Sequence, residues 1–133
     1  MLNISPYMHL PFAERGRDHA GVDCYGLHYL ICHEQLNLAV PSYAERYATT
    51  KDTDEIAAII NRERLSMWQS VTPEEVQAGD LVILRIVGRP WHCGTMLSKT
   101  KFLHIEEGAN VCREDITSTR WARRVEGFFR WSN

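Results

Sequence analysis

Three side chains that can bind a metal ion or act as a nucleophile recur every four residues in the segment GVDCYGLHYLICHE: Cys24, His28 and Cys32. On a helix the first and last would lie about 12 Å apart, because each residue adds about 1.5 Å. A zinc ion holds Cys and His ligands at about 2.0–2.3 Å, so one ion cannot bind all three. No CxxC or HExxH pattern elsewhere completes a tetrahedral site. We therefore expect no metal site and no cofactor.

Cys24 fits the requirements of a thiolate nucleophile better. Asp23 can cap the helix that follows, and the unpaired N–H groups of a helix start lower the pKa of a thiol placed there. Such a nucleophile needs a histidine base. His28 is one helical turn away, but that geometry leaves little room for a substrate between the two side chains. We expect His28 to pack and the base to come from a strand.

Two histidines lie in segments that alternate with the period of a strand. In WHCGTML, residues 91–97, alternation places His92 and Cys93 on opposite faces, so both cannot face Cys24. KFLHIEE, residues 101–107, follows one hairpin later and contains His104. If the two segments pair, His104 lies beside His92 and accepts a hydrogen bond from its ring. That contact would orient the imidazole, as the third member of a catalytic triad does.

The elements that must hold these groups follow from the periodicity. Residues 1–20 have no period and predict an irregular leader. Helices are expected from residue 23 or 24 to about 36, and from about 53 to 68 with Asp52 and Glu55 in a capping-box pattern. Four segments with a period of two follow: LVILRIV, WHCGTML, KFLHIEE and RRVEGFFRW. We expect one α+β domain over residues 1–133, with N-terminal helices packed on a four-strand antiparallel meander.

Composition excludes several classes of protein. The chain has 133 residues, 44% of them hydrophobic, and a net charge of −2, which fits one globular domain and offers no attraction to nucleic acid. No stretch reaches the roughly 20 apolar residues of a membrane span. The amino terminus MLNISPYMHLPF lacks a basic segment followed by an apolar one, so we expect no signal peptide and synthesis in the bacterial cytoplasm. The four cysteines are expected to be free thiols.

The order of these motifs resembles the NlpC family of papain-like cysteine peptidases. The matching residues are Asp23-Cys24-Tyr25-Gly26-Leu27, Gly79-Asp80-Leu81-Val82, His92-Cys93-Gly94 and Leu103-His104. Members typically have D-C-S-G-[LF] at a helix start, G-D before a strand, H-x-G on the sheet and a polar residue about a dozen positions later. Further upstream, a P-F…G-R-D…G-V-D-C pattern resembles the K-like branch of phage tail-tip assembly proteins. It is formed by Pro11-Phe12, Gly16-Arg17-Asp18 and Gly21 to Cys24.

The resemblance implies a papain-like fold and a peptidase that hydrolyses the γ-D-glutamyl to diaminopimelate bond of peptidoglycan stem peptides. Cys24 would attack the amide, His92 would act as base and then as acid, and His104 would orient His92. The backbone N–H of Cys24 would help to stabilise the oxyanion. The implied partners are the peptidoglycan peptide and other phage tail proteins, and the implied location is a phage tail.

Two departures from the family pattern affect the oxyanion and substrate groups, which we expect among Asp23, Phe12, Tyr25 and Trp91. Phe12 stands where the family often has a tyrosine whose hydroxyl lies near the oxyanion, so activity would be weaker unless Tyr7 or Tyr25 substitutes. Tyr25 stands where serine is usual. Two alternatives stay open: a structural tail component that has lost hydrolysis, and a thiol amidase or acyltransferase on the same fold.

Overall fold

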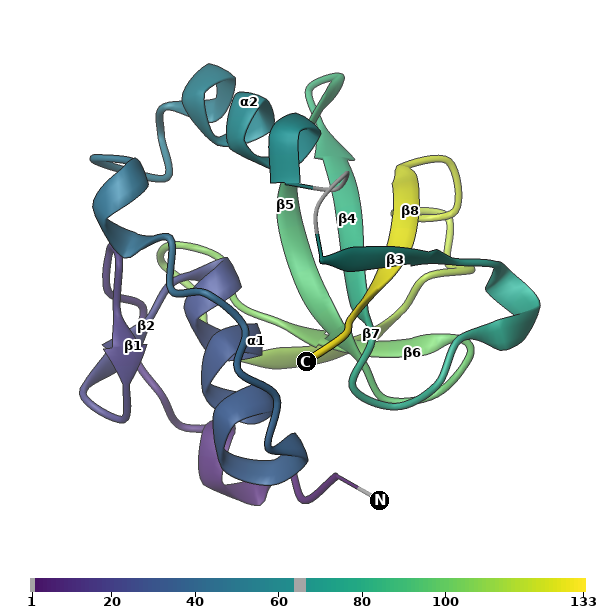
Figure 1. Ribbon diagram of the computed structural model, residues 1–133, viewed down its shortest axis with the longest axis horizontal. Helices are drawn as coiled ribbons and strands as arrows, with labels where there is room; N and C mark the ends of the chain where they lie inside the picture. The colour runs from purple at the N-terminus through teal and green to yellow at the C-terminus, as the bar shows by residue number, and fades with distance from the viewer. Residues whose placement is uncertain (1, 64–66) are drawn as a thin grey trace.

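Two helices pack on one side of a six-stranded antiparallel sheet in the computed structural model, which describes residues 2–63 and 67–133 (Figure 1). The helices are α1 (Cys24–Ile31) and α2 (Thr53–Glu63). The strands of the sheet are β3 (Trp68–Val71), β4 (Leu81–Ile86), β5 (Arg89–Met96), β6 (Lys101–His104), β7 (Cys112–Asp115) and β8 (Val125–Trp131). The predicted α+β architecture is confirmed.

The strand order β3-β8-β4-β5-β6-β7 differs from the predicted meander. β4, β5 and β6 follow one another as expected, but β8 returns to pair with β4. β7 pairs with β6 and β3 pairs with β8, and neither of these short strands was predicted. The β4–β5 hairpin turns at Val87 and Gly88, both with positive φ, so β5 begins earlier than predicted, at Arg89. Alternation within a segment fixes which face it buries but not which strand becomes its neighbour.

Helix α1 begins where the sequence predicts. Asp23 is the N-cap, and its carboxylate accepts a hydrogen bond of 2.8 Å from the N–H of Gly26. After Ile31 the chain continues as a π-helical segment, η2 (Cys32–Leu36), and Asn37 closes it in the left-handed conformation. The predicted end near residue 36 is therefore confirmed, although the last turn is wider than that of an α-helix.

Helix α2 also begins at its predicted cap, since Asp52 accepts a hydrogen bond of 3.2 Å from the N–H of Glu55. Its predicted end at residue 68 is wrong because Trp68 belongs to β3, and residues 64–66 lie outside the described part of the chain. A complete capping box occurs at η4 (Pro73–Glu75), where Thr72 and Glu75 bond each other.

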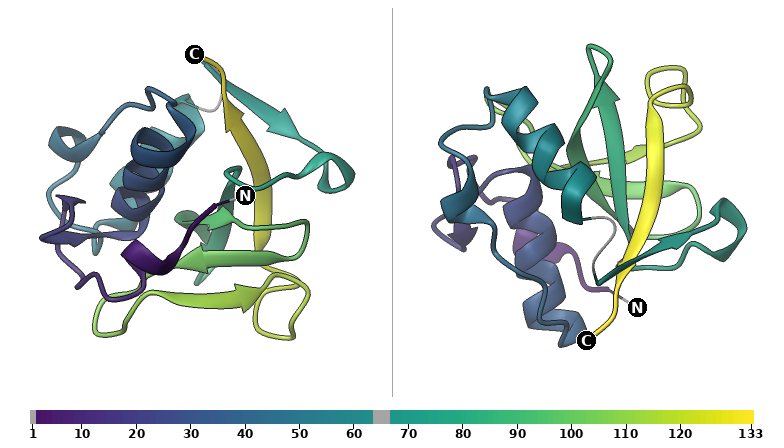
Figure 2. Two further views of the ribbon diagram at one scale, coloured as in Figure 1. Left: turned by 90° about the horizontal axis from the view of Figure 1, so that it is seen from below. Right: turned by 45° about the horizontal axis from the view of Figure 1, so that its top comes forward.

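The leader packs against α1. It contains η1 (Ser5–Tyr7) and a small hairpin of β1 (Arg17–Asp18) and β2 (Gly21–Val22). Figure 2 shows it running beside α1 toward the green strands. A Cβ on Gly26 would lie 1.9 Å from the carbonyl oxygen of Gly16, so the leader requires a glycine in the first turn of α1. Its apolar side chains share one core cluster with α1 and residues around β6: Tyr7, Leu10, Val22, Leu27, Leu30, Ile31, Leu103, Ile105 and Val111.

The central strand β4 is buried on both faces. Leu81 and Ile83 pack in the cluster beneath the helices, whereas Val82 and Leu84 pack in a second cluster around Trp121. The helix-facing cluster holds Cys24, and the second cluster lies beside the two strand histidines. Among the described residues, no helix has the length and apolar character that crossing a membrane requires.

Candidate active site

Cys24 is the first residue of α1, so its backbone N–H belongs to the turn that lacks acceptors within the helix. Its side chain is buried, with 6% of the residue exposed. Interactions with the neighbouring Cys93 thiol and with His92 lower the pKa of Cys24 to about 6, against the raising effects of burial and of the Asp23 charge. At neutral pH the thiolate is therefore the main form of this side chain.

His92 lies on β5 and is buried. Its Nε2 is 2.8 Å from Nδ1 of His104 on β6. Its other ring nitrogen, Nδ1, is buried without a hydrogen-bond partner in the described chain. That nitrogen is therefore the one available to the proton of the Cys24 thiol. The structure brings together the three residues that the sequence motifs associate with catalysis.

The expectation that His92 and Cys93 cannot both face Cys24 is wrong. Their side chains do alternate: Cys93 packs beneath the helices, and the ring of His92 stacks on Trp121 in the second cluster. Cys24 nevertheless interacts with both. β6 pairs only with residues 95–96 of β5, so the part of β5 before them has no β6 partner, and α1 packs on β5. A sulfur placed beside such an edge can reach side chains from both faces.

Gly94 lets the two histidine strands approach each other. A Cβ on Gly94 would lie 2.8 Å from both the carbonyl oxygen of Leu103 and the ring of Phe102, and 3.3 Å from Cβ of His104. A larger residue here would displace β6 and, with it, His104. The glycine of the H-x-G motif therefore has a steric reason in this chain.

A fourth polar group, Glu114 on β7, extends the hydrogen-bond chain and was not identified from the sequence. Its Oε2 is hydrogen-bonded to Nε2 of His104, and its Oε1 accepts a hydrogen bond of 3.0 Å from Nε1 of Trp121. Burial raises the pKa of Glu114, but the hydrogen bonds from His104 and Trp121 lower it by more than burial raises it. The net shift of the Glu114 pKa is therefore downward. The segment CRED is too short and too polar to predict a strand, although alternation would place Cys112 and Glu114 on one face.

Asp23 holds the start of α1 through four internal contacts. Besides the cap at Gly26, its carboxylate accepts hydrogen bonds from the guanidinium of Arg17 at 2.8 Å, from the N–H of Arg15 at 3.0 Å and from the hydroxyl of Tyr47. Arg17 also donates a hydrogen bond of 2.7 Å to Tyr47. Asp23 is fully buried, so these contacts use its acceptor sites within the protein and fix the turn that carries the thiol.

His28 has contacts that fit the predicted packing role. Its Nδ1 lies 2.8 Å from Oγ1 of Thr95, and its Nε2 lies 3.3 Å from Sγ of Cys32. Burial lowers the pKa of His28 to about 3, so the ring is neutral at physiological pH. Both ring nitrogens are occupied, which leaves none for Cys24.

The geometry of the site agrees with a family comparison. The model of the NlpC/P60 family matches residues 9–130, which is most of the chain. The chain belongs to the NlpC/P60 family. No curated protein matches it. The comparisons carry no support for the finer resemblance to phage tail-tip proteins.

Three crystal structures illustrate how this NlpC/P60 chain relates to others. A protein similar to an NLP/P60 family lipoprotein from Staphylococcus aureus subsp. aureus Mu50 is 20% identical, with a TM-score of 0.65 over 96% of this chain and 38% of that one. The NlpC/p60 domain of the peptidoglycan hydrolase SagA is 19% identical, with a TM-score of 0.59 over 96% and 90% of the two chains. An NlpC/P60 family protein from Bacillus cereus ATCC 10987 is 17% identical, with a TM-score of 0.65 over 94% and 36%.

At these identities the likeness establishes the fold. Our chain spans little more than a third of the Staphylococcus and Bacillus proteins and nearly all of the SagA domain. The fold is therefore that of one NlpC/P60 domain, which in two of these relatives occupies part of a longer chain.

The tyrosine hydroxyls that were candidates to replace the one missing at Phe12 have other partners. Tyr7 donates a hydrogen bond of 2.9 Å to Glu34, and Tyr25 donates one of 2.8 Å to the carbonyl oxygen of Pro41. Phe12 packs on the core cluster that the leader shares with α1 and the residues around β6, not on the cluster that contains Cys24. In this NlpC/P60 domain both hydroxyls are therefore engaged elsewhere, and Cys24 lies beside the backbone N–H groups at the start of α1.

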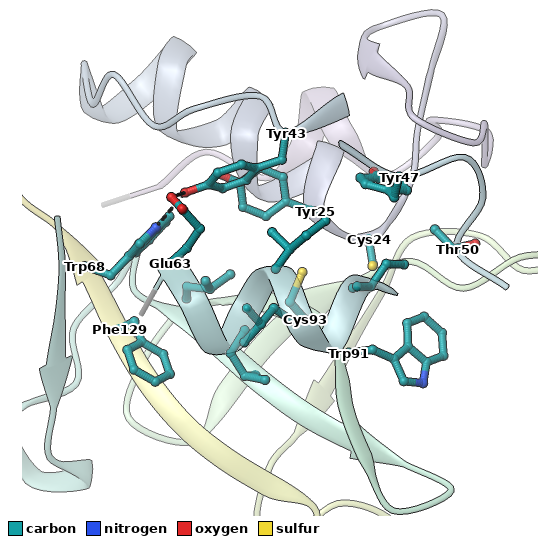
Figure 3. Close-up of a pocket in the computed structure, with 15 residues that line it drawn as sticks. Cys24, Tyr25, Tyr43, Tyr47, Thr50, Glu63, Trp68, Trp91, Cys93 and Phe129 are labelled. Carbon is teal, nitrogen blue, oxygen red and sulfur yellow. Dashed lines mark hydrogen bonds between the residues drawn. The ribbon is translucent and has the colours of Figure 1, made fainter. Parts of the chain in front are cut away.

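A pocket lies between α2 and the sheet, with Cys24 in its wall (Figure 3). It encloses about 670 Å³ of space, including its open mouth. The sulfurs of Cys24 and Cys93 lie close to each other in the close-up, and Trp91 stands at the same end. The lining is mostly apolar or aromatic: Cys24, Tyr25, Tyr43, Tyr47, Thr50, Ile56, Ile59, Ile60, Glu63, Trp68, Leu81, Ile83, Trp91, Cys93 and Phe129. No lysine, arginine or histidine is among these described lining residues.

Three potential metal ligands, His104, Cys112 and Glu114, have ligand atoms within 4.8 Å of one another. The hydrogen bond between His104 and Glu114 accounts for the closeness of two of them. Cys112 adds a longer contact of 3.5 Å to Nε2 of His104. We assign these atoms to the hydrogen-bond chain behind His92.

Proposed function

We propose that this NlpC/P60 domain is a cysteine peptidase that hydrolyses peptidoglycan stem peptides at a γ-D-glutamyl to diaminopimelate bond. The observation that carries the proposal is the meeting of a low-pKa thiol at a helix start, Cys24, with His92, whose far nitrogen is hydrogen-bonded to His104. A nucleophile, a base and an orienting group are the parts that acyl transfer by a thiol requires.

The reaction follows from these positions. The Cys24 thiolate attacks the carbonyl carbon, and the backbone N–H of Cys24 lies at the helix start, where the oxyanion would form. His92, protonated at Nδ1, gives that proton to the amide nitrogen as the C–N bond breaks, which releases the amine and leaves a thioester. Water then gives a proton to His92 and attacks the thioester, the C–S bond breaks, and the thiolate returns with a carboxylate product.

Two parts of the proposal are more specific than the family itself: the peptidoglycan bond that is cleaved and the role in a phage tail. The similarity to the domain of SagA, a protein described as a peptidoglycan hydrolase, supports peptidoglycan as the substrate. A role in a phage tail, with other tail proteins as partners, rests on the upstream pattern around Phe12 and Gly16-Arg17-Asp18 alone.

Digestion of purified sacculi tests the enzyme. We expect the wild type to release peptides with a new amino terminus at diaminopimelate, identified by mass spectrometry, and Cys24→Ala and His92→Ala to release none. Fragments cut at another amide would overturn the proposed bond but not the mechanism. A folded wild type with a reactive thiolate and no turnover would instead support the structural, inactive alternative.

A second candidate function, a thiol amidase or acyltransferase, is favoured by the pocket beside Cys24. A stem peptide carries several carboxylates, yet the described lining has no lysine, arginine or histidine and is mostly apolar or aromatic, with the hydroxyl of Thr50 and the carboxyl of Glu63. Such a lining suits an acyl chain or an aromatic group. A series of acyl p-nitrophenyl esters of increasing chain length separates the two: kcat/KM that rises steeply with length supports an apolar acyl substrate, and a flat series supports the peptidase.

A further inference from the structure

We propose that Glu114 is a positioning residue that fixes the tautomer of His104, and through it the nitrogen with which His92 serves Cys24. The inference rests on the proposed thiol mechanism and adds a fourth member to its hydrogen-bond chain. It comes from the order of the contacts: thiol, His92, His104 and the Glu114 carboxylate.

The direction of each hydrogen bond in this series follows from its last member, the carboxylate of Glu114. A carboxylate can only accept, so the hydrogen in its contact with His104 must be on Nε2 of that ring. Burial lowers the pKa of His104, helped by the nearby His92, so the ring is neutral and carries a single N–H. Nδ1 of His104 is then an acceptor, and it faces Nε2 of His92 at 2.8 Å.

The acceptor nitrogen of His104 determines which ring nitrogen of His92 can exchange a proton with Cys24. Nε2 of His92 must donate to it, which leaves the buried and unpartnered Nδ1 as the site that takes up and releases the thiol proton. In the imidazolium form, both N–H groups of His92 then have acceptors, one at the Cys24 sulfur and one at His104. The opposite tautomer of His104 would present N–H to N–H and destabilise the ion pair.

Glu114 is itself held in place. Trp121 donates to its Oε1 at 3.0 Å, and Arg120 lies 3.2 Å from its Oε2. The Trp121 ring is fully buried. Glu114 therefore accepts from two fixed N–H donors, Nε2 of His104 and Nε1 of Trp121, and only a group with two acceptor oxygens satisfies both.

Other titratable groups lie beside this row of hydrogen bonds, and one of them gives a matched control. Cys112 lies 3.5 Å from Nε2 of His104, and Glu106 lies near enough to act on the pKa of His104 through its charge. Arg120 pairs with Glu106 at 2.7 Å as well as with Glu114. Glu106→Gln thus removes a carboxylate from the same arginine without removing the hydrogen-bond partner of His104.

Imidazole ¹⁵N NMR of the wild-type protein tests the tautomer directly and needs no substrate. We expect the hydrogen of His104 on Nε2. Finding it on Nδ1 overturns the proposal, whatever the fate of any variant.

The second test compares Glu114→Gln with Glu106→Gln by the pH profile of Cys24 alkylation with iodoacetamide. The amide of glutamine can satisfy only one of the two N–H donors, so we expect the alkylation midpoint to rise by about one pH unit in Glu114→Gln. On sacculi we expect kcat to fall about 10- to 100-fold with little change in KM. Glu106→Gln removes only a charge that acts on His104, so it should change the midpoint and kcat far less than Glu114→Gln does.

The outcomes separate this proposal from the proposed function. A folded Glu114→Gln whose alkylation profile matches the wild type shows that Glu114 has no positioning role. Absence of sacculus hydrolysis by the wild type would count against the peptidase but leave the NMR and alkylation comparison intact. If Glu114→Gln does not fold, Glu114→Asp, which keeps both acceptor oxygens on a shorter arm, takes its place and should shift the midpoint in the same direction.

Discussion

Nε2 of His92 lies 2.8 Å from Nδ1 of His104, and the two rings stand nearly perpendicular, at 76°. The proposed base and its orienting group thus come from adjacent strands of the same sheet. The proposed nucleophile comes from a helix that packs on that sheet. Reactivity of Cys24 therefore reports on how these elements are assembled.

His92→Ala removes the proposed base and its positive charge beside the thiol. We expect the midpoint of Cys24 alkylation to rise from about 6 toward the ordinary thiol pKa of about 8.5. Hydrolysis of sacculi should fall by about three orders of magnitude or more, as when other catalytic bases are removed. His28→Gln is the matched control, since His28 lies on α1 one turn after Cys24, and it should leave the midpoint near the wild-type value. A large shift in that control with none in His92→Ala would make His28 the base.

Cys93→Ala removes the strongest influence that lowers the pKa of Cys24. The thiol of Cys93 can donate to the neighbouring thiolate, and without it we expect the alkylation midpoint to move upward. Cys93→Ser keeps a donor of similar size and should retain most of the depression. Iodoacetamide rates between pH 4 and pH 9 on both variants measure the difference. Equal midpoints in Cys93→Ala and the wild type would mean that Cys93 only packs.

The buried His28 makes the fold sensitive to acid. Its pKa is about 3 in the folded protein and about 6.5 when unfolded, so below pH 6.5 the unfolded state binds the extra proton and stability falls with falling pH. From this group alone we expect a loss of about 2 kcal/mol in the free energy of unfolding between pH 7 and pH 5. Urea unfolding of the wild type and of His28→Gln at the two pH values measures it. The variant should lose less on acidification, and an equal loss in both would contradict the assignment.

Asp23→Ala leaves the partly buried guanidinium of Arg17 without its carboxylate and removes the cap of α1. We expect a loss of about 3–5 kcal/mol in the free energy of unfolding, as for other broken buried pairs. The exposed pair of Asp54 and Arg89 is the control, and Asp54→Ala should cost less than about 1 kcal/mol. Urea unfolding measures both, and similar costs would mean that Asp23 is not the anchor of the helix start.

The start of α1 was predictable because the residues that determine it lie next to it in the sequence. Asp23 caps its own helix, and the turn that follows is set within a few residues. The pairing of His92 with His104 was also predictable, since one hairpin separates the two segments and period-two alternation fixes their faces. These features require no knowledge of distant parts of the chain.

The parts that sequence reasoning missed depend on distant contacts or on weak patterns. Pairing of β8 with β4 joins segments more than 40 residues apart, which alternation cannot specify. Glu114 lies on a strand of four mostly polar residues that forms only because β6 offers it an edge. Cys24 interacts with both His92 and Cys93 beside the part of β5 that has no β6 partner, so strict alternation gave the wrong answer.

Trp121 stacks on the ring of His92 at 6.1 Å between centroids and 15° between planes, while its N–H is bonded to Glu114. A protonated imidazole in contact with an indole quenches its fluorescence, whereas a neutral one does so weakly. The emission of this buried indole should therefore brighten when the thiolate–imidazolium pair is discharged by acylation of Cys24. Trp121 fluorescence should therefore report the protonation of His92 during the reaction. Stopped-flow experiments can follow it without any added label.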